Sequence, residues 1–285
     1  PAHHYRHVFQ GGKLVFRLAL LILLCLPVVA TGSQEAPNLC LSCHQAHHQQ
    51  YGTCIDCHRG DPRSSRLNIA HFGLIQARHA WFNLPDTSEV EQGTRQIKTN
   101  ACRRCHVIGK KGNQLATNLD RSTAVSDPLT LVEAIRNPVL LMPDFHLPDF
   151  RLDVLINALF SLGQNVGVVS DEMPQIVHFE GRDRMEENLF VKHCGGCHQA
   201  LTATLGGLGN GIVAPNLSGL LTEYYPETAK DNSAWNRDNL KKWLKNPRDI
   251  RPLAQMMPVR LEDEELTQLF DILDEEISLP QQQFP

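Results

Sequence analysis

Aromatic residues, basic charge and long apolar runs are all scarce in this sequence. Aromatic residues make up 6% of the 285 residues, which is few if protein atoms alone build the core. The formal net charge is −4, and no basic patch with interleaved aromatic residues indicates nucleic-acid binding. With 42% hydrophobic and 20% charged residues, the chain still has the balance of a globular protein. Its length allows two or three small domains.

One apolar run near the N-terminus is too short to be an ordinary membrane span. It covers residues 18–30, whereas a transmembrane helix needs about 20 apolar residues. The run follows three basic residues and ends in small ones, which predicts a secretory signal peptide at residues 1–30, cleaved after Ala30. Two alternatives stay open: an uncleaved membrane anchor lengthened by residues 14–16, and lipid attachment at Cys25. All three predict that the rest of the chain is periplasmic or lies on the outer face of the cytoplasmic membrane.

Eight of the nine cysteines belong to four motifs of one kind. Each motif is a Cys-x-x-Cys pair followed at once by histidine, and only Cys25 is left over. Chance predicts roughly 0.01 such motifs for a chain of this composition. The cysteines are Cys40 and Cys43, Cys54 and Cys57, Cys102 and Cys105, and Cys194 and Cys197; the histidines are His44, His58, His106 and His198.

The spacing of the motif has a chemical reason. Two thiols three positions apart can each bond one vinyl group of the same haem, and the next residue then lies under the iron as its proximal ligand. Zinc sites do not require a histidine after every cysteine pair, and four disulfides would leave the histidines without a role. A thioredoxin-like redox pair would be single and set between a strand and a helix. We therefore predict four covalently bound haem c groups, which would also supply part of the core.

The third motif is followed by two predicted helices with a methionine between them. Asp127 and Pro128 favour a helix start, and the Asn-Pro pair at residues 137–138 favours its end. Met142, itself followed by proline, comes next. A leucine-rich stripe then predicts a second helix over residues 151–162.

The fourth motif repeats this order. A helix predicted over residues 183–193 leads into it, and a helix over residues 239–245 ends at another Asn-Pro pair. Met256 and Met257 follow, and Met257 directly precedes proline. A closing amphipathic helix has acidic residues at positions 262–265, where negative charge suits the helix dipole.

This order of motif, helix, Met-Pro and closing helix resembles class I cytochrome c domains, over about residues 88–165 and 181–279. The Ala-Pro-Asn-Leu-Ser-Gly loop at residues 214–219 is also similar to that family's mid-domain loop. The resemblance implies small helical domains that each wrap one haem between histidine and methionine. By the resemblance, His106 pairs with Met142 and His198 with Met257, and Met256 stays an alternative. Outside this context such methionines would be read as core residues.

The first two motifs are too close together for two domains of that kind. Nine residues separate His44 from Cys54, and no methionine occurs in residues 1–141. The crowding resembles bis-histidine multihaem cytochromes, in which distal ligands come from scattered histidines. We expect His71 and His48 to be the distal ligands here, with His79 and His47 as alternatives.

The predicted fold is therefore mainly α, with two small class I-like cytochrome c domains following a loop-rich dihaem module. The expected limits are residues 1–30 for the signal peptide or anchor, 31–87 for the dihaem module, 88–165 for the first class I-like domain, 166–180 for a linker, 181–279 for the second domain and 280–285 for a tail.

The mixture of ligand types predicts electron transfer outside the cytoplasm. Methionine raises the potential of a haem above that of a bis-histidine haem, so we expect a lower-potential pair and a higher-potential pair. The expected partners are redox proteins, with the chain acting as a shuttle or as a subunit of a membrane quinol-oxidising or respiratory complex. A haem enzyme of the dihaem-peroxidase type is the alternative, and it requires an iron with an open or releasable position. Distal ligands for all four irons favour the carrier, and no residue is given a catalytic role.

Overall fold

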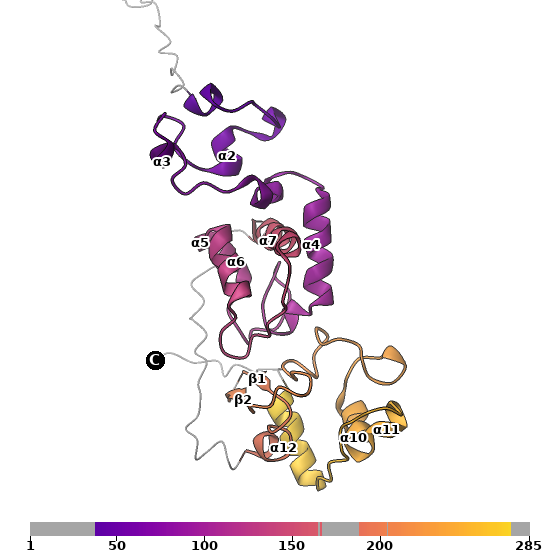
Figure 1. The fold of residues 1–285 in the computed structure, drawn as a ribbon. Helices are drawn as coiled ribbons and strands as arrows, with labels where there is room; N and C mark the ends of the chain where they lie inside the picture. The colour runs from indigo at the N-terminus through magenta and orange to yellow at the C-terminus, as the bar shows by residue number, and fades with distance from the viewer. Residues whose placement is uncertain (1–37, 165, 167–187, 204, 275–285) are drawn as a thin grey trace, which may run out of the picture. The chain divides into compact units, whose positions relative to one another are not determined.

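The protein is described here from a computed structural model that covers residues 38–164, 166, 188–203 and 205–274. Within these residues it is mainly helical, and its only strands are β1 and β2 (Figure 1). This confirms the predicted fold class. The predicted signal peptide or anchor, the tail and nearly all of the linker lie outside the described residues. No helix in the described part is long and apolar enough to cross a membrane.

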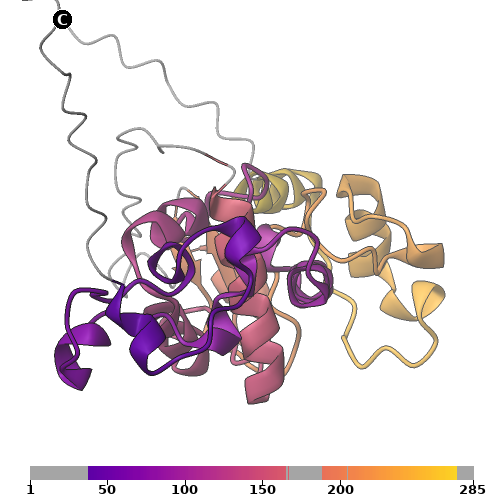
Figure 2. The same ribbon diagram turned by 90° about the horizontal axis from the view of Figure 1, so that it is seen from above.

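The segment from Leu39 to Asn83 consists of short helical turns joined by irregular chain (Figure 2). No described residue from 38 to 74 is buried. Large apolar side chains are instead exposed there, as expected for a segment that packs against flat apolar groups. The turns are η1 (Leu39–Ser42), η2 (Gln49–Tyr51), α2 (Cys54–His58), α3 (Leu67–Ala70), η3 (Ala77–His79) and η4 (Trp81–Asn83). The exposed apolar residues are Leu41, Tyr51, Ile55, Leu67, Ile69, Phe72 and Leu74.

The next part of the chain folds around one hydrophobic cluster. Its elements are α4 (Ser88–Thr99), η5 (Cys102–Arg104), α5 (Leu119–Val125), α6 (Pro128–Arg136) and α7 (Asp149–Gln164). α6 begins as predicted, because the Asp127 side chain accepts a hydrogen bond from the Thr130 amide at 2.9 Å and Pro128 occupies the first turn. α7 is two residues longer at each end than the predicted helix. Four of the five residues of its apolar stripe are buried, namely Leu152, Leu155, Ile156 and Leu159.

α4 and α7 pack side by side with their backbones in close approach (Figures 1 and 2). The approach occurs at Gly93, where an added Cβ atom would clash with the Val154 carbonyl oxygen and the Ala158 side chain. Only a residue without a side chain leaves room for this crossing. The contact joins the helix that precedes the third motif to the helix that follows Met142.

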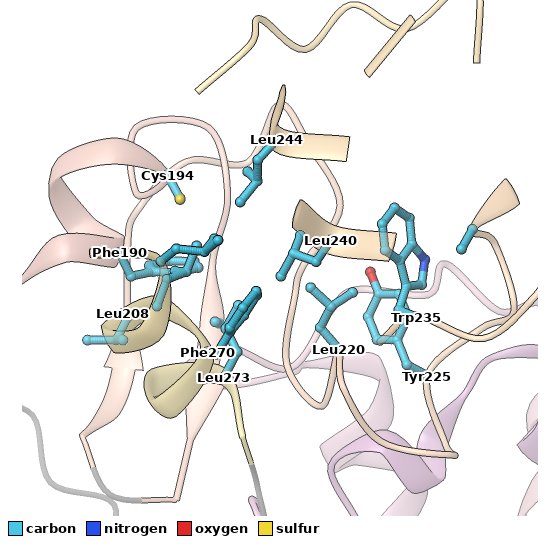
Figure 3. Close-up of a cluster of buried hydrophobic side chains, with 14 residues drawn as sticks. Phe190, Cys194, Leu208, Leu220, Tyr225, Trp235, Leu240, Leu244, Phe270 and Leu273 are labelled. Carbon is cyan, nitrogen blue, oxygen red and sulfur yellow. The ribbon is translucent and has the colours of Figure 1, made fainter. Parts of the chain in front are cut away.

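The C-terminal part of the chain has its own hydrophobic cluster, drawn in Figure 3. α10 begins two residues before the predicted start, because the Asn236 side chain accepts a hydrogen bond from the Asn239 amide at 2.8 Å. α12 carries the predicted apolar stripe, and all four of its residues are buried: Leu266, Leu269, Phe270 and Leu273. The elements are α9 (Leu189–His193), β1 (Ala200–Thr202), β2 (Gly206–Leu208), η6 (Lys230–Asn232), α10 (Arg237–Lys245), α11 (Pro247–Ile250) and α12 (Asp263–Leu273).

Two elements of this part differ from the sequence prediction. β1 and β2 form an antiparallel hairpin with Ala200 opposite Leu208, directly after the fourth motif. α11 begins at Pro247, where only a helix end was expected. Pro247 is well suited to start a helix, because its fixed φ fits the first turn and it has no amide hydrogen to satisfy.

Candidate haem sites

All four cysteine motifs adopt a helical turn. The amide of His44 donates to Cys40 O at 2.9 Å, and the amides of His106 and His198 donate to the first cysteine of their motifs at 3.1 and 2.9 Å. The second motif forms α2 itself. Residues three and four apart on such a turn lie on the same side. Each turn therefore presents two thiols and one imidazole together, as covalent attachment and axial ligation of one haem require.

Three of the four motif histidines are held by a backbone carbonyl. Their Nδ1 atoms lie 3.1 Å from Ile75 O for His58, 2.8 Å from Thr117 O for His106 and 2.7 Å from Pro215 O for His198. A carbonyl accepts only from a protonated Nδ1, so the neutral ring keeps the lone pair of Nε2 for a metal. Such outer hydrogen bonds fix the ring orientation and increase the basicity of the ligating nitrogen. The three rings are therefore oriented to ligate through Nε2.

The third motif lines a cavity of about 350 Å³ that also contains Met142. Cys102, Cys105 and His106 lie on one part of its wall, and α5, α6 and α7 contribute apolar side chains to the rest. Burial lowers the pKa of His106, against the opposing effect of its hydrogen bond to Thr117 O. The ring is therefore neutral at pH 7, which is the form that binds a metal. The cavity brings together the ligands that the resemblance implied for one haem.

The fourth motif lines a cavity of about 780 Å³ that contains both Met256 and Met257. Cys194 is buried in the hydrophobic cluster, and Figure 3 shows its sulfur among the apolar side chains. The cavity wall includes Trp243 of α10. This cavity also has the thiols, the imidazole and the apolar walls that suit a covalently bound haem.

The two adjacent methionines differ in their surroundings. The sulfur of Met256 accepts a hydrogen bond from the Trp243 indole at 3.0 Å, and its side chain is partly buried. Met257 is 69% exposed and makes no such contact among the described residues. A thioether sulfur has two lone pairs, so both sulfurs could bind a metal, and only that of Met256 has one lone pair engaged. The sequence offered no means to see this, because the role of Trp243 depends on the fold.

The buried thiols are uncharged at neutral pH. Burial raises the pKa of Cys102 and of Cys194 to about 11, and it also raises the pKa of Cys57. Zinc-binding thiolates need the opposite environment, since they bind the metal deprotonated. All eight motif cysteines are free of disulfides in the structure. The surroundings of Cys102 and Cys194 are therefore compatible with thioether bonds to a haem.

The histidines of the N-terminal segment fall into two close pairs. The ring centroids of His44 and His71 are 6.0 Å apart, and those of His47 and His58 are 5.7 Å apart. The ring of His48 lies against His47 at 5.2 Å. The structure thus places His47, rather than the expected His48, next to a motif histidine.

His79 has a different role from the one considered for it. Its side chain is 1% exposed, and its Nε2 lies 2.8 Å from an Asp153 carboxylate oxygen on α7. Burial lowers its pKa, against the opposing effect of Asp153. Its Nε2 therefore packs the end of η3 onto α7, while its Nδ1 is buried without a hydrogen-bond partner.

His193 is a residue whose surroundings the sequence did not reveal. It ends α9, as expected, and lines the cavity of the fourth motif. Its Nε2 is buried and has no hydrogen-bond partner. A buried polar atom without a partner is costly, and its position at the cavity wall fits a bound group that offers a polar atom.

Comparison with known proteins identifies one part of the chain. Residues 187–273 match the family model for cytochrome c. This range contains the fourth motif, both adjacent methionines and all of the C-terminal hydrophobic cluster. The match supports a c-type cytochrome that binds haem covalently and transfers electrons. A search of curated proteins gave no match to the chain.

Proposed function

We propose that the chain is an exported tetrahaem cytochrome that transfers electrons between redox partners outside the cytoplasm. The observation that carries this proposal is the occurrence of four Cys-x-x-Cys-His turns, three of which hold their histidine by a carbonyl. Haem iron supplies one-electron redox chemistry when it is bound. The protein residues attach the group, set its axial ligands and exclude water from its faces.

The roles of the residues follow from the motif chemistry. The eight motif cysteines would form thioether bonds, and His44, His58, His106 and His198 would be the proximal ligands. Met142 would be the distal ligand in the cavity lined by the third motif. Met257 would be the distal ligand of the fourth motif, since it directly precedes proline as Met142 does and one lone pair of the Met256 sulfur is engaged by Trp243; Met256 is the alternative.

The location and the partners are part of the same proposal. The apolar run at residues 18–30, with basic residues before it, supports export across the cytoplasmic membrane. An exported carrier with haems of two ligand types is suited to link a membrane quinol-oxidising or respiratory complex to a redox protein. Co-purification with membrane subunits would support the role of a subunit, and a monodisperse protein without partners would support the role of a shuttle.

The number of haems is the direct test of the proposal. Intact-mass measurement of the purified protein should give the polypeptide plus four haems. Changing both cysteines of one motif to serine should remove one haem from that count, for each motif in turn. Ser42→Ala is the matched control, because it changes a variable position inside the first motif and should leave the number unchanged. A count below four would refute the tetrahaem assignment, and a high-spin iron in the native protein would favour the peroxidase-type enzyme.

A further inference from the structure

The N-terminal histidine pairs have the separation that axial ligation of one metal requires. Two imidazole nitrogens about 2 Å from a shared metal, with each ring centre roughly 1 Å further out, put the ring centres about 6 Å apart. The observed separations are 6.0 Å for His44 with His71 and 5.7 Å for His47 with His58. Each pair joins one proximal histidine to one histidine outside the motifs.

We propose that the two N-terminal haems have crossed distal ligands. His71, which follows the second motif in sequence, ligates the iron of the first motif opposite His44. His47, which belongs to the chain just after the first motif, ligates the iron of the second motif opposite His58. The assignment rests on the proposed haem-binding function, and it names which histidine serves which iron.

The chain around His71 is tied to the first motif. The amide of Leu39, at the start of the first motif, donates to Pro62 O at 2.8 Å. The amide of Asp61 in turn donates to Ala70 O at 3.0 Å, immediately before His71. These two bonds close the loop between residues 61 and 70 and connect it to the turn that carries Cys40. The fold therefore holds His71 near the first motif, although the second motif is nearer in sequence.

The second motif is fixed from both of its ends. Thr53 and Asp56 form a reciprocal capping box at the start of α2, with the Thr53 amide donating to Asp56 Oδ2 at 2.7 Å. At its other end, Ile75 accepts from the His58 ring and donates its amide to His58 O at 2.8 Å. The ring of His58 therefore has a fixed orientation, with His47 at its side.

The two competing histidines lie outside the two close pairs. The His48 backbone adopts a left-handed conformation, with φ at 51°, and caps η2. Its ring contacts the ring of His47 rather than that of a motif histidine. His79 is buried against α7 and bound to Asp153. The separations from the motif histidines therefore favour His71 and His47 as the two distal ligands.

The ligand assignment can be tested by spectroscopy of three variants. In His47→Ala and His71→Ala, all four haems should stay attached by intact mass, and one of the four should change from low-spin to high-spin. Low-temperature electron paramagnetic resonance and near-infrared magnetic circular dichroism report this change. Added imidazole should restore the low-spin signal. His48→Ala is the matched control, and it should leave all four haems low-spin.

The crossing itself needs a second set of variants, each lacking one haem. In the Cys54→Ser/Cys57→Ser protein, His71→Ala should still produce a high-spin haem, whereas His47→Ala should not. In the Cys40→Ser/Cys43→Ser protein the two substitutions should exchange their effects. Should the alanine variants lose haem during maturation, His47→Met and His71→Met keep a ligand and should each add one methionine-to-iron absorption band.

The possible failures are distinguishable. A native protein with fewer than four haems would refute the proposed function. Four haems with a spectrum changed by His48→Ala, and not by His47→Ala, would overturn the ligand assignment alone. In the Cys54→Ser/Cys57→Ser protein, a high-spin haem produced by His47→Ala and not by His71→Ala would overturn the crossing. His47 and His71 would then still be the distal ligands, each of the other iron.

Discussion

Single hydrogen bonds set the chemistry of these sites. A carbonyl held at the Nδ1 atom decides which nitrogen of a motif histidine can bind iron, and this happens at His58, His106 and His198. In the same way, the indole of Trp243 decides which of two adjacent methionines has an engaged sulfur. Neither effect can be predicted from the motifs, because the carbonyls and the indole lie outside them and reach these side chains only in the folded chain.

The methionine choice gives a prediction at this scale. Met257→Ala should remove the far-red methionine-to-iron band of one of the two methionine-ligated haems, so that about half of its intensity is lost. Met256→Leu should keep the band, because leucine preserves the volume and the sulfur of Met256 is not the ligand. Optical spectra of the oxidised proteins, compared at equal haem content, measure both effects. Loss of the band in Met256→Leu alone would assign the ligand to Met256.

At the scale of elements, the contact between α4 and α7 stabilises the part of the chain that runs from α4 to α7. Gly93 makes that contact possible, since a side chain there would meet the backbone and not a flexible side-chain end. α7 also carries Asn157, whose side chain is fully buried and accepts a hydrogen bond from the Phe82 amide at 3.0 Å. These two residues tie the helix that follows Met142 to the chain before the third motif.

Gly93→Ala should therefore destabilise the protein. Alanine alone favours a helix by about 1 kcal/mol over glycine, but forcing the two helices apart costs about 1–3 kcal/mol, so we expect a lower free energy of unfolding. Denaturant titration of the holoprotein measures the difference. Gly196→Ala is the matched control, because a Cβ atom there meets nothing within 4 Å. Equal or greater stability of Gly93→Ala would contradict the close packing.

Helices with an apolar stripe could be predicted from the sequence, and the elements without one could not. α6, α7, α10 and α12 were predicted because their apolar residues recur at helical spacing. The β1–β2 hairpin has three-residue strands, which are too short to show an alternating pattern. The four motifs were clear from their spacing alone. The pairing of His47 with His58 depends on loops that carry no periodic signal.

At the scale of the whole molecule, the described chain contains two kinds of environment. From residue 38 to residue 74 no residue is buried, and the candidate distal ligands there are histidines. The other two motifs line cavities with apolar walls, and each cavity contains methionine. Ligand type and burial both tune the potential of a haem, over a range of roughly 0.8 V. The difference in ligand type is the one that predicts two classes of potential, because a second imidazole favours the oxidised iron more than a thioether sulfur does.

A redox titration of the holoprotein should therefore resolve two lower-potential and two higher-potential haems. The physical reason is that thioether sulfur stabilises the reduced iron more than a second imidazole does. Met142→His is the informative variant, since it changes one higher-potential haem to bis-histidine ligation and should give three lower-potential haems and one higher. Spectroelectrochemistry, with the methionine-to-iron band followed separately from the haem bands, assigns each step to a ligand type. Four haems that titrate at a common potential would remove the basis for two classes.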